Sequence, residues 1–216
     1  MSVARKLGLI AVMLLWSCSG PAAGRTYGED SGGNLLPDAS FELAENTAAG
    51  FGTDAGYWVK RTYAEQNGRE IYNAPDSKST LSKIPAGLSG KCAAAMTLAP
   101  GDQWMYMQTW YIAGEPFKPG TRYLFSLAAR ADKPAQINLF TDVWRQPEKG
   151  QGEGGENKNA DSERGNFVVT PDWQRYEICL FITADSADAK RIRLIVQDFT
   201  PGVRVLLDDV CLEKLP

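Results

Sequence analysis

Carboxylate side chains stand at both ends of the part of this chain that has a strand-like pattern. Asn34–Glu42 opens that part and Val205–Glu213 closes it, and each segment places carboxylates among apolar residues. If each segment is a strand with one buried face, these carboxylates lie close to the core. A carboxylate in that position needs a cation or a hydrogen-bond donor. Any group that joins the two segments therefore also joins the two ends of the domain.

Other segments carry the residue types that recognise sugars. Pyranose rings stack their C–H faces on aromatic rings, and their hydroxyls hydrogen-bond to amide, carboxylate and guanidinium groups. In Gln103–Tyr111 and Ala135–Trp144, aromatic and polar residues alternate so that each set shares one strand face. The candidate ligand-binding residues are Trp58, Trp104, Tyr106, Gln108, Trp110, Arg130, Asn138, Asp142 and Trp144.

The alternation in these segments has a second interpretation. Aromatic residues at a spacing of two also fill the core of a β-sandwich, so the same residues could be buried between two sheets. Trp58, Trp104 and Trp144 lie nearest to the predicted loops. These three are therefore expected to be the exposed members of the set.

Catalysis would have to depend on carboxylates, because the sequence contains no histidine. This absence excludes His-dependent triads and most catalytic zinc sites. A glycosidase needs two carboxyl groups on a rigid frame. Glu153 with Glu156 and Asp161 with Glu163 lie in a glycine-rich segment that is expected to be flexible, which leaves only Glu65 with Glu70 to be tested. The sequence therefore predicts a protein without enzymatic activity.

The bulk charge limits the class of partner. The formal net charge is −3, the pI is near 5.2, and Lys and Arg form no dense cluster. Nucleic-acid binding through phosphate contacts requires such a cluster, so the composition argues against a nucleic-acid partner. The length of 216 residues allows one domain with a sizeable core.

The N-terminus has the pattern of an export signal. Arg5 and Lys6 precede an apolar run over residues 7–15 that is too short to span a bilayer. Residues 15–20 resemble a bacterial lipobox, in which Cys18 becomes the lipidated first residue, and Ser19 favours delivery to the outer membrane. The alternative is secretion with cleavage near residues 22–23. We expect a signal peptide over 1–18, a flexible tether over 19–33 and one domain over 34–216.

Short apolar-alternating runs bounded by Gly, Pro, Asn and Asp recur from Asn34 onwards, and no segment keeps a helical period over three turns. Thr121–Ala131 and Arg191–Gln197 show the two faces of a half-buried strand most plainly. This pattern predicts an all-β fold, an antiparallel two-sheet jelly-roll sandwich. Two polar insertions, Gly50–Gly87 and Gln146–Asn166, interrupt the pattern, and the centre of the second is expected to be disordered.

Five segments, in order along the chain, resemble motifs of the carbohydrate-binding modules attached to bacterial xylanases and cellulases, the CenC-like group. They are Asn34–Glu42, Ser89–Met96, Gln108–Tyr123, Thr170–Tyr176 and Leu207–Glu213. The resemblance covers about residues 34–214 and implies a galactose-binding-like β-sandwich. Modules of this group usually have Gly-Trp soon after the opening Glu, whereas here Trp58 follows Tyr57 after a longer interval. The resemblance therefore implies the fold more strongly than any particular ligand.

The resemblance also implies a structural calcium ion. In the family, residues like Glu42 and Asp209 supply side-chain oxygens and a carbonyl near Lys91 completes the shell. Calcium prefers roughly six to eight hard oxygen ligands, which suits this set. The alternative is that Glu42 and Asp209 cap turns or pair with Lys91 or Arg204.

Cysteines could add one crosslink to the domain. An exported chain can keep a disulfide among Cys92, Cys179 and Cys211. Because the implied calcium site would bring Lys91 near Asp209, Cys92 with Cys211 is the preferred pair.

We therefore predict non-catalytic binding of a polysaccharide or oligosaccharide at the bacterial cell surface, with a lipid on Cys18 as the link to the membrane. The alternative is a structural or assembly lipoprotein that binds a protein partner through the same sandwich.

Overall fold

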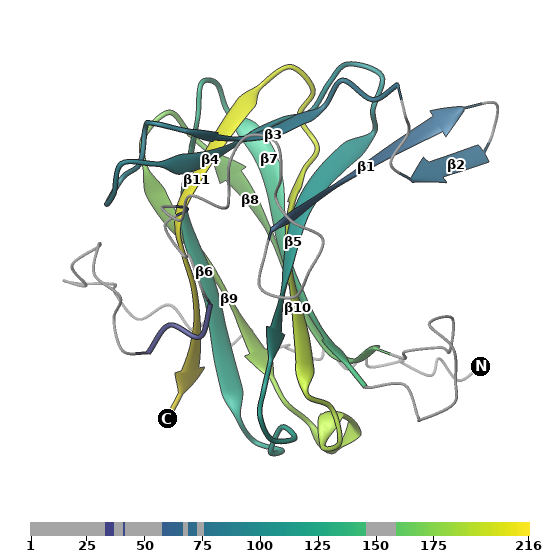
Figure 1. Cartoon of the computed structure of the whole chain (residues 1–216), viewed down its shortest axis with the longest axis vertical. Helices are drawn as coiled ribbons and strands as arrows, with labels where there is room; N and C mark the ends of the chain where they lie inside the picture. Colours follow the sequence, from purple (N-terminus) through teal and green to yellow (C-terminus); the bar gives the residue numbers. More distant parts are fainter. Residues whose placement is uncertain (1–32, 37–40, 42–57, 67–68, 73–75, 146–158) are drawn as a thin grey trace, which may run out of the picture.

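The computed structural model describes residues 33–36, 41, 58–66, 69–72, 76–145 and 159–216 (Figure 1). The predicted signal peptide, Cys18, Glu42 and nearly all of the predicted tether lie outside the described residues, as do residues 146–158 of the second polar insertion. Within the described ranges, no helix is long and apolar enough to cross a lipid bilayer.

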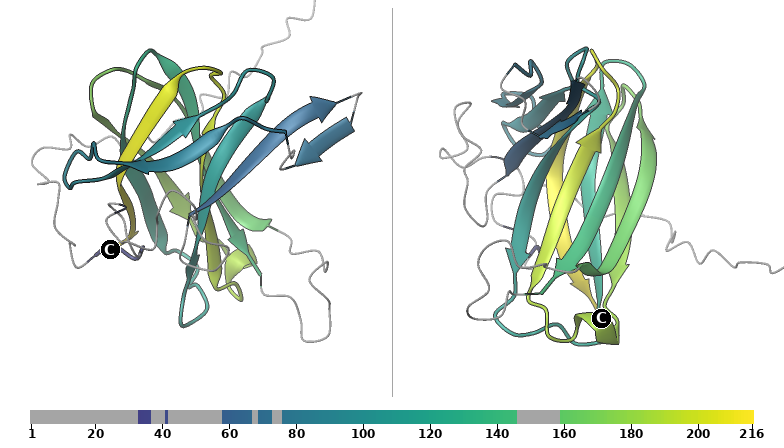
Figure 2. Two further views of the ribbon diagram at one scale, coloured as in Figure 1. Left: turned by 45° about the horizontal axis from the view of Figure 1, so that its top comes forward. Right: turned by 90° about the vertical axis from the view of Figure 1, so that its right-hand side faces the viewer.

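The described strands form two antiparallel sheets that face each other (Figures 1 and 2). The six-stranded sheet has the order β2-β1-β5-β10-β7-β8 and the five-stranded sheet the order β3-β4-β11-β6-β9. The bounds are β1 (Val59–Gln66), β2 (Arg69–Tyr72), β3 (Thr80–Ile84), β4 (Ala93–Thr97), β5 (Trp104–Ile112), β6 (Arg122–Ala131), β7 (Ala135–Trp144), β8 (Asn159–Val169), β9 (Gln174–Phe181), β10 (Arg191–Asp198) and β11 (Arg204–Leu215). One short 3-10 helix, η1 (Ala184–Ser186), precedes β10. The predicted all-β, two-sheet antiparallel sandwich is confirmed.

The core lies between the two sheets and takes one parity of residues from the central strands, except that the parity in β11 changes at a bulge between Asp208 and Cys211. A strand points successive side chains to opposite sides, so every second residue can be buried against the facing sheet. Burying one large apolar side chain stabilises the fold by roughly 1.5–3 kcal/mol. The two faces predicted for Thr121–Ala131 and Arg191–Gln197 are confirmed in β6 and β10, where the residues of one face are buried in the core: Tyr123, Phe125, Leu127, Ile192, Leu194 and Val196.

Two Pro-Gly turns lead into strands β6 and β11. Gly120 has φ +87° and Gly202 has φ +75°, a region that residues with a Cβ rarely adopt. A Cβ at either position would meet no atom within 4 Å, so backbone conformation and not packing calls for glycine. The turn before β6 is closed by Thr121 N, which donates to Lys118 O at 3.1 Å.

Asn34 joins the first described segment of the domain to its last strand. Its main chain forms an isolated antiparallel bridge with Glu213 of β11. Its side-chain Nδ2 donates to Val210 O at 3.0 Å, and its Oδ1 accepts from Leu212 N and Leu36 N at 3.1 Å each. The connection between the two ends of the domain, anticipated from their carboxylates, is made here by an amide side chain.

The structure corrects the expectation for the cysteines. No disulfide joins Cys92, Cys179 and Cys211. Strand β4 pairs with β11 only as far as Leu207, before Cys211, and Cys211 lies opposite Ser126 of β6. The preferred pair, Cys92 with Cys211, is therefore wrong.

Replacing Asn34 with alanine should lower the free energy of unfolding by roughly 2–3 kcal/mol. Three main-chain groups lose a hydrogen-bond partner, and each such bond contributes about 0.5–1.5 kcal/mol. Urea-induced unfolding measures the loss. Asn166→Ala, at an exposed position of β8, is the control and should change stability by less than about 0.5 kcal/mol. Equal losses in the two variants would contradict the role assigned to Asn34.

Candidate functional site

The face of the six-stranded sheet that is turned away from the core is called the outer face here. Residues paired across neighbouring antiparallel strands point to the same side, so the outer face is built of rows that cross the sheet. Arg193 of β10 lies between Trp110 of β5 and Asp142 of β7 in one row, and Arg191 lies beside Trp144 in the next. Other members are Arg61, Tyr63, Trp104, Tyr106, Gln108, Gln136, Asn138, Phe140, Arg164, Asn166, Ile195 and Gln197.

The outer face brings together all but two of the ligand-binding residues predicted from the sequence. They are Trp104, Tyr106, Gln108, Trp110, Asn138, Asp142 and Trp144. The alternative, in which this parity fills the core, is wrong, because the residues of the opposite parity in β5 do so: Met105 and Met107 have no exposed surface. The four aromatic residues of the set remain partly exposed.

The structure places Trp58 and Arg130 away from this face. Trp58 precedes β1 and is only 1% exposed, and its ring lies 6.0 Å from that of the buried Phe41. The expectation that Trp58 is exposed is therefore wrong, because its ring belongs to the core. Arg130 lies in β6 of the five-stranded sheet, where its guanidinium is 5.3 Å from the Trp173 ring. Alternation within one strand does not reveal which sheet that strand joins.

Three aromatic rings, called the aromatic stack here, lie on one end of the outer face. The rings of Tyr63 and Trp104 are nearly parallel at 4.7 Å, and Trp104 and Tyr106 stack at 5.2 Å. Tyr63 reaches this position because β1 pairs with β5 and places Tyr63 opposite Trp104. Tyr63 is not among the residues predicted from the sequence, since it lies in a polar segment without a clear strand pattern.

Two tryptophans and two arginines, called the tryptophan–arginine cluster here, lie on the other end of the outer face. The rings of Trp110 and Trp144 meet edge to face at 5.6 Å. The Arg193 guanidinium lies 4.8 Å from the Trp144 ring and 5.8 Å from the Trp110 ring, and that of Arg191 lies 5.8 Å from Trp110. These distances are within the range of cation–π attraction. Neither arginine is among the ligand-binding residues predicted from the sequence.

Arg193 of this cluster forms an ion pair with the buried carboxylate of its neighbour Asp142. Arg193 Nε donates to Asp142 Oδ1 at 2.9 Å, and Arg193 Nη2 donates to Asp142 Oδ2. The Asp142 side chain has no exposed surface, whereas 20% of the Arg193 side chain is exposed. A two-point pair of this geometry fixes the plane of the guanidinium. Arg193 is therefore held flat between Asp142 and the two tryptophan rings.

Polar side chains fill the middle of the outer face. Gln108 lies on the row between the aromatic stack and the tryptophan–arginine cluster, and Asn138 lies on the row of Tyr106, next to Gln197. Gln108 and Asn138 are buried, whereas Gln197 is partly exposed. Asn138 Oδ1 and Trp144 Nε1 are buried without a hydrogen-bond partner. Arg164 of β8 covers the Phe140 ring at 4.8 Å. The outer face thus combines aromatic surface with amide and guanidinium groups.

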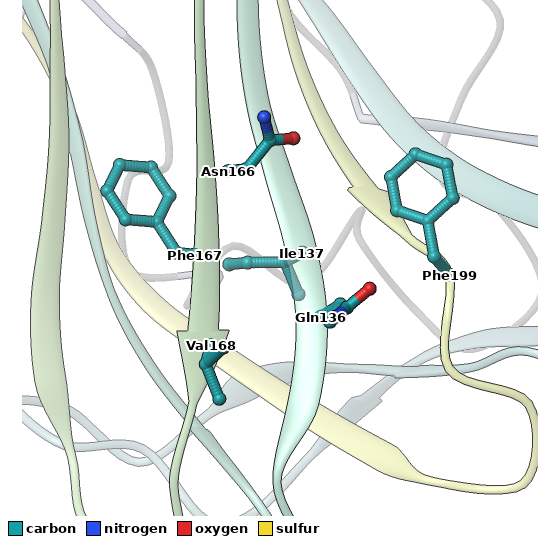
Figure 3. A pocket seen from close by; sticks show the side chains of 6 residues that line it. All are labelled: Gln136, Ile137, Asn166, Phe167, Val168 and Phe199. Carbon is teal, nitrogen blue, oxygen red and sulfur yellow. The ribbon is translucent and has the colours of Figure 1, made fainter.

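A shallow pocket of about 190 Å³ lies where β7 and β8 meet the segment after β10. Figure 3 shows Asn166, Phe167 and Val168 of β8 beside Gln136 and Ile137 of β7, with Phe199 on the other side of β7. Val168 and Phe199 are 56% and 38% exposed. Next to Phe199, burial raises the pKa of Asp198 to about 6, although Thr200 N donates to its carboxylate.

The carboxylates of β11 lie beside the turn over residues 86–91. Asp208 Oδ2 accepts hydrogen bonds from Leu88 N at 2.6 Å and Ser89 N at 3.2 Å, and burial raises the pKa of Asp208. Asp209 has φ +48° and accepts from the Ser89 hydroxyl through Oδ1, while its Oδ2 is buried without a hydrogen-bond partner. Lys91, in the same turn, is exposed. Among the residues that the structure describes, no three His, Cys, Asp or Glu side chains gather in the manner of a metal site, and Glu42 is not one of those residues.

Comparisons with known proteins identify the fold. No model of a protein family matches the sequence, and no curated relative does. Among solved structures, TmCBM61 in complex with β-1,4-galactotriose has a TM-score of 0.52 and 15% identity, with 84% of this chain and 99% of that one covered. A CBM4 structure has a TM-score of 0.50 and 19% identity, with 83% and 99% covered. A protein from Bacteroides thetaiotaomicron provisionally assigned to sugar binding has a TM-score of 0.53 and 14% identity, with 84% and 100% covered.

Enzymes are also among the similar structures. The match to the enzymatically active domain of tailspike protein 4 from bacteriophage CBA120 covers 84% of this chain and 21% of that one, with a TM-score of 0.55 and 14% identity. It covers 98% of a Stig cyclase from Fischerella, with a TM-score of 0.52 and 12% identity. The fold therefore does not by itself separate binding from catalysis. The chain has the β-sandwich fold of carbohydrate-binding modules.

Replacing Arg193 with methionine should lower the free energy of unfolding by roughly 3–5 kcal/mol, because the buried Asp142 carboxylate loses its cation. Adding Asp142→Leu should restore most of this loss, since an apolar pair of similar volume removes the buried charge. Urea-induced unfolding of the wild type, both single variants and the double variant gives the coupling energy. Losses that simply add would contradict the pairing.

Proposed function

We propose that this protein binds a polysaccharide or oligosaccharide along the outer face of the six-stranded sheet and does not cleave it. The observation that carries the proposal is the arrangement of the outer face. Aromatic rings lie on both ends of that face, and polar side chains lie between them. Aromatic rings provide platforms for the apolar faces of sugars, and amides provide paired hydrogen bonds to hydroxyls.

The length of the outer face suits a chain of sugars and not a single one. Trp104 and Trp110 lie six residues apart on the same face of β5. At roughly 3.4 Å per residue, this separation is about 20 Å. A ligand that touches both the aromatic stack and the tryptophan–arginine cluster must therefore extend over several sugar units.

The charged groups of the outer face support binding without catalysis. A glycosidase needs two carboxyl groups that are available to the substrate. Among the outer-face side chains that the structure describes, Asp142 carries the one carboxylate. This carboxylate is buried and forms an ion pair with Arg193. Glu65 and Glu70 are paired residues of β1 and β2, but their side chains are outside the description. No histidine occurs in the sequence to replace a carboxylate as the base.

The similar structures point in the same direction. TmCBM61 was solved with β-1,4-galactotriose, and its whole length matches this chain. The CBM4 structure is also matched over its whole length. We infer that a domain of this size works as a binding module, and that a glycan is the class of ligand.

We further propose that the protein is exported and held at the bacterial outer membrane by a lipid on Cys18. The support for this proposal is the sequence of residues 1–20, in which a basic start and a short apolar run lead to a lipobox-like Cys. A glycan-binding domain at that location would hold a polysaccharide close to the cell surface. A protein partner remains the alternative to a glycan.

Replacing Trp110 and Trp144 with alanine should weaken glycan binding by roughly tenfold or more for each ring, because stacking surface and its cation–π partner are lost. Affinity electrophoresis against a polysaccharide panel measures the retardation. Trp173→Ala, on the five-stranded sheet, is the matched control and should bind like the wild type. A panel that retards no protein, together with a protein that co-purifies, would favour the alternative function.

We also propose a calcium ion beside Asp209. The residues fit a hard cation, because Asp209 Oδ2 is a buried carboxylate oxygen without a hydrogen-bond partner and Asp208 lies next to it. Asp209 and Glu42 would hold the ion, with a main-chain carbonyl near Lys91. The ion would be structural, since Asp208 and Asp209 join β11 to the segment before β4 and lie outside the outer face.

Chelation should lower the melting temperature of the wild-type protein. A ligand present at about 100 times its dissociation constant stabilises the folded state by about 2.7 kcal/mol. Asp209→Asn should show no further shift on chelation, and asparagine tolerates the left-handed backbone of this position. Thermal melting with and without EDTA measures both effects. An unchanged melting temperature of the wild type on chelation would exclude the ion.

A further inference from the structure

We propose that the glycan bound by the outer face is acidic, with carboxylate or sulfate groups on its sugar units. This inference rests on the proposed function and names the class of ligand. It depends on an imbalance of charge that the sequence as a whole does not show, since the formal net charge of the chain is −3.

Arginines dominate the charged side chains of the outer face. The paired rows place Arg61, Arg164, Arg191 and Arg193 on this face, and Asp142 is their acidic counterpart among the described side chains. Asp142 neutralises Arg193. The remaining three guanidinium groups give the described part of the outer face a positive charge in a chain that is acidic overall.

The positions of Arg164 and Arg191 suit a ligand better than a structural role. Each guanidinium lies over an aromatic ring of the same face, Arg164 over Phe140 at 4.8 Å and Arg191 over Trp110 at 5.8 Å. The structure describes no carboxylate that pairs with either of them. Arg164 is exposed and Arg191 is partly exposed. Stacking on a ring orients a guanidinium while its N–H groups stay available to an anion.

The hydrogen-bonding geometry of the guanidinium group favours an anionic ligand. Arginine binds carboxylates and sulfate-like oxyanions through parallel N–H donors, and it is the side chain best suited to such planar recognition. A neutral glycan would leave these cations without a partner when it covered the face and removed water. The arginines are spread over strands β1, β8 and β10, so the anion must recur along the ligand. A polymer with a charge on its repeating units meets this condition.

Two acidic residues occupy paired backbone positions near the far edge of the sheet. Glu65 and Glu70 form a paired position of β1 and β2, on the side of Tyr63 that is remote from β10. The four arginines lie on the other side of the aromatic stack or beside it. An acidic ligand would therefore run from the aromatic stack toward the tryptophan–arginine cluster, away from the edge that carries Glu65 and Glu70.

Affinity electrophoresis against matched polysaccharides tests the inference. Polygalacturonate is compared with its carboxyl-reduced form, and dextran sulfate with dextran. We expect retardation by one or both of the charged polymers and much weaker retardation by their uncharged forms, with the effect falling as salt is raised. Retardation by polygalacturonate alone assigns a carboxylate, and retardation by dextran sulfate alone assigns a sulfate.

An Arg164→Gln/Arg191→Gln double variant should bind the charged polymer roughly tenfold more weakly or worse, because two charge-assisted contacts are lost. Arg130→Gln is the matched control, since Arg130 also lies over a tryptophan but on the other sheet. Thermal melting checks that both variants are folded.

Three results would overturn the inference. Retardation by the uncharged polymers with no loss in the double variant would exclude an acidic ligand and leave the proposed function intact. No retardation by any polysaccharide would overturn both. Tight binding to single-stranded DNA in place of the polysaccharides would also overturn both, and would assign the aromatic and arginine side chains to a nucleic acid.

Discussion

The two-residue period of the strands is the constraint on which the outer face depends. In β5 it places Met105, Met107 and Thr109 against the core, and it turns Trp104 and Trp110 outward. A shift of one residue in the pairing of β5 would exchange the two sets and put indole rings into the core. Strand β5 is paired on both sides, with β1 and β10. The same pairing that buries the methionines therefore also builds the face on which we place the ligand.

The ion pair between Arg193 and Asp142 belongs to the outer face and not to the core. A buried ion pair adds little to stability compared with apolar residues of the same volume, because both charges must lose their water. Here the pair has its guanidinium in contact with two tryptophan rings. Its location is better explained by the geometry of the face than by stability.

Much of the fold and part of the face could be predicted from the sequence. Alternation within β5 and β7 was sufficient to group Trp104 with Trp110 and Asn138 with Trp144, because parity is a property of one strand. The order of the strands is not such a property. Strand β10 lies between β5 and β7 although it follows them in the chain by many residues.

That strand order explains which residues were missed. Arg191 and Arg193 reach the tryptophans only through the insertion of β10 between β5 and β7. Arg130 was selected for its residue type, but β6 belongs to the opposite sheet. Trp58 was selected because it lies near a loop, yet a ring at the start of a strand can turn into the core. Side-chain chemistry identified candidates, and only the pairing of strands could decide among them.

The net charge of the chain shows the same limit. Averaged over 216 residues, the sequence is acidic, and this average argued against a polyanionic partner such as a nucleic acid. A ligand does not meet the average. It meets the charges within about 8–10 Å, the distance over which salt at physiological concentration screens them. Among the outer-face side chains that the structure describes, these charges are mostly arginines that come from three different strands, so no basic cluster is visible along the sequence. The sheet thus brings together cations that are far apart in the sequence, and the proposal of an acidic ligand rests on this positive surface.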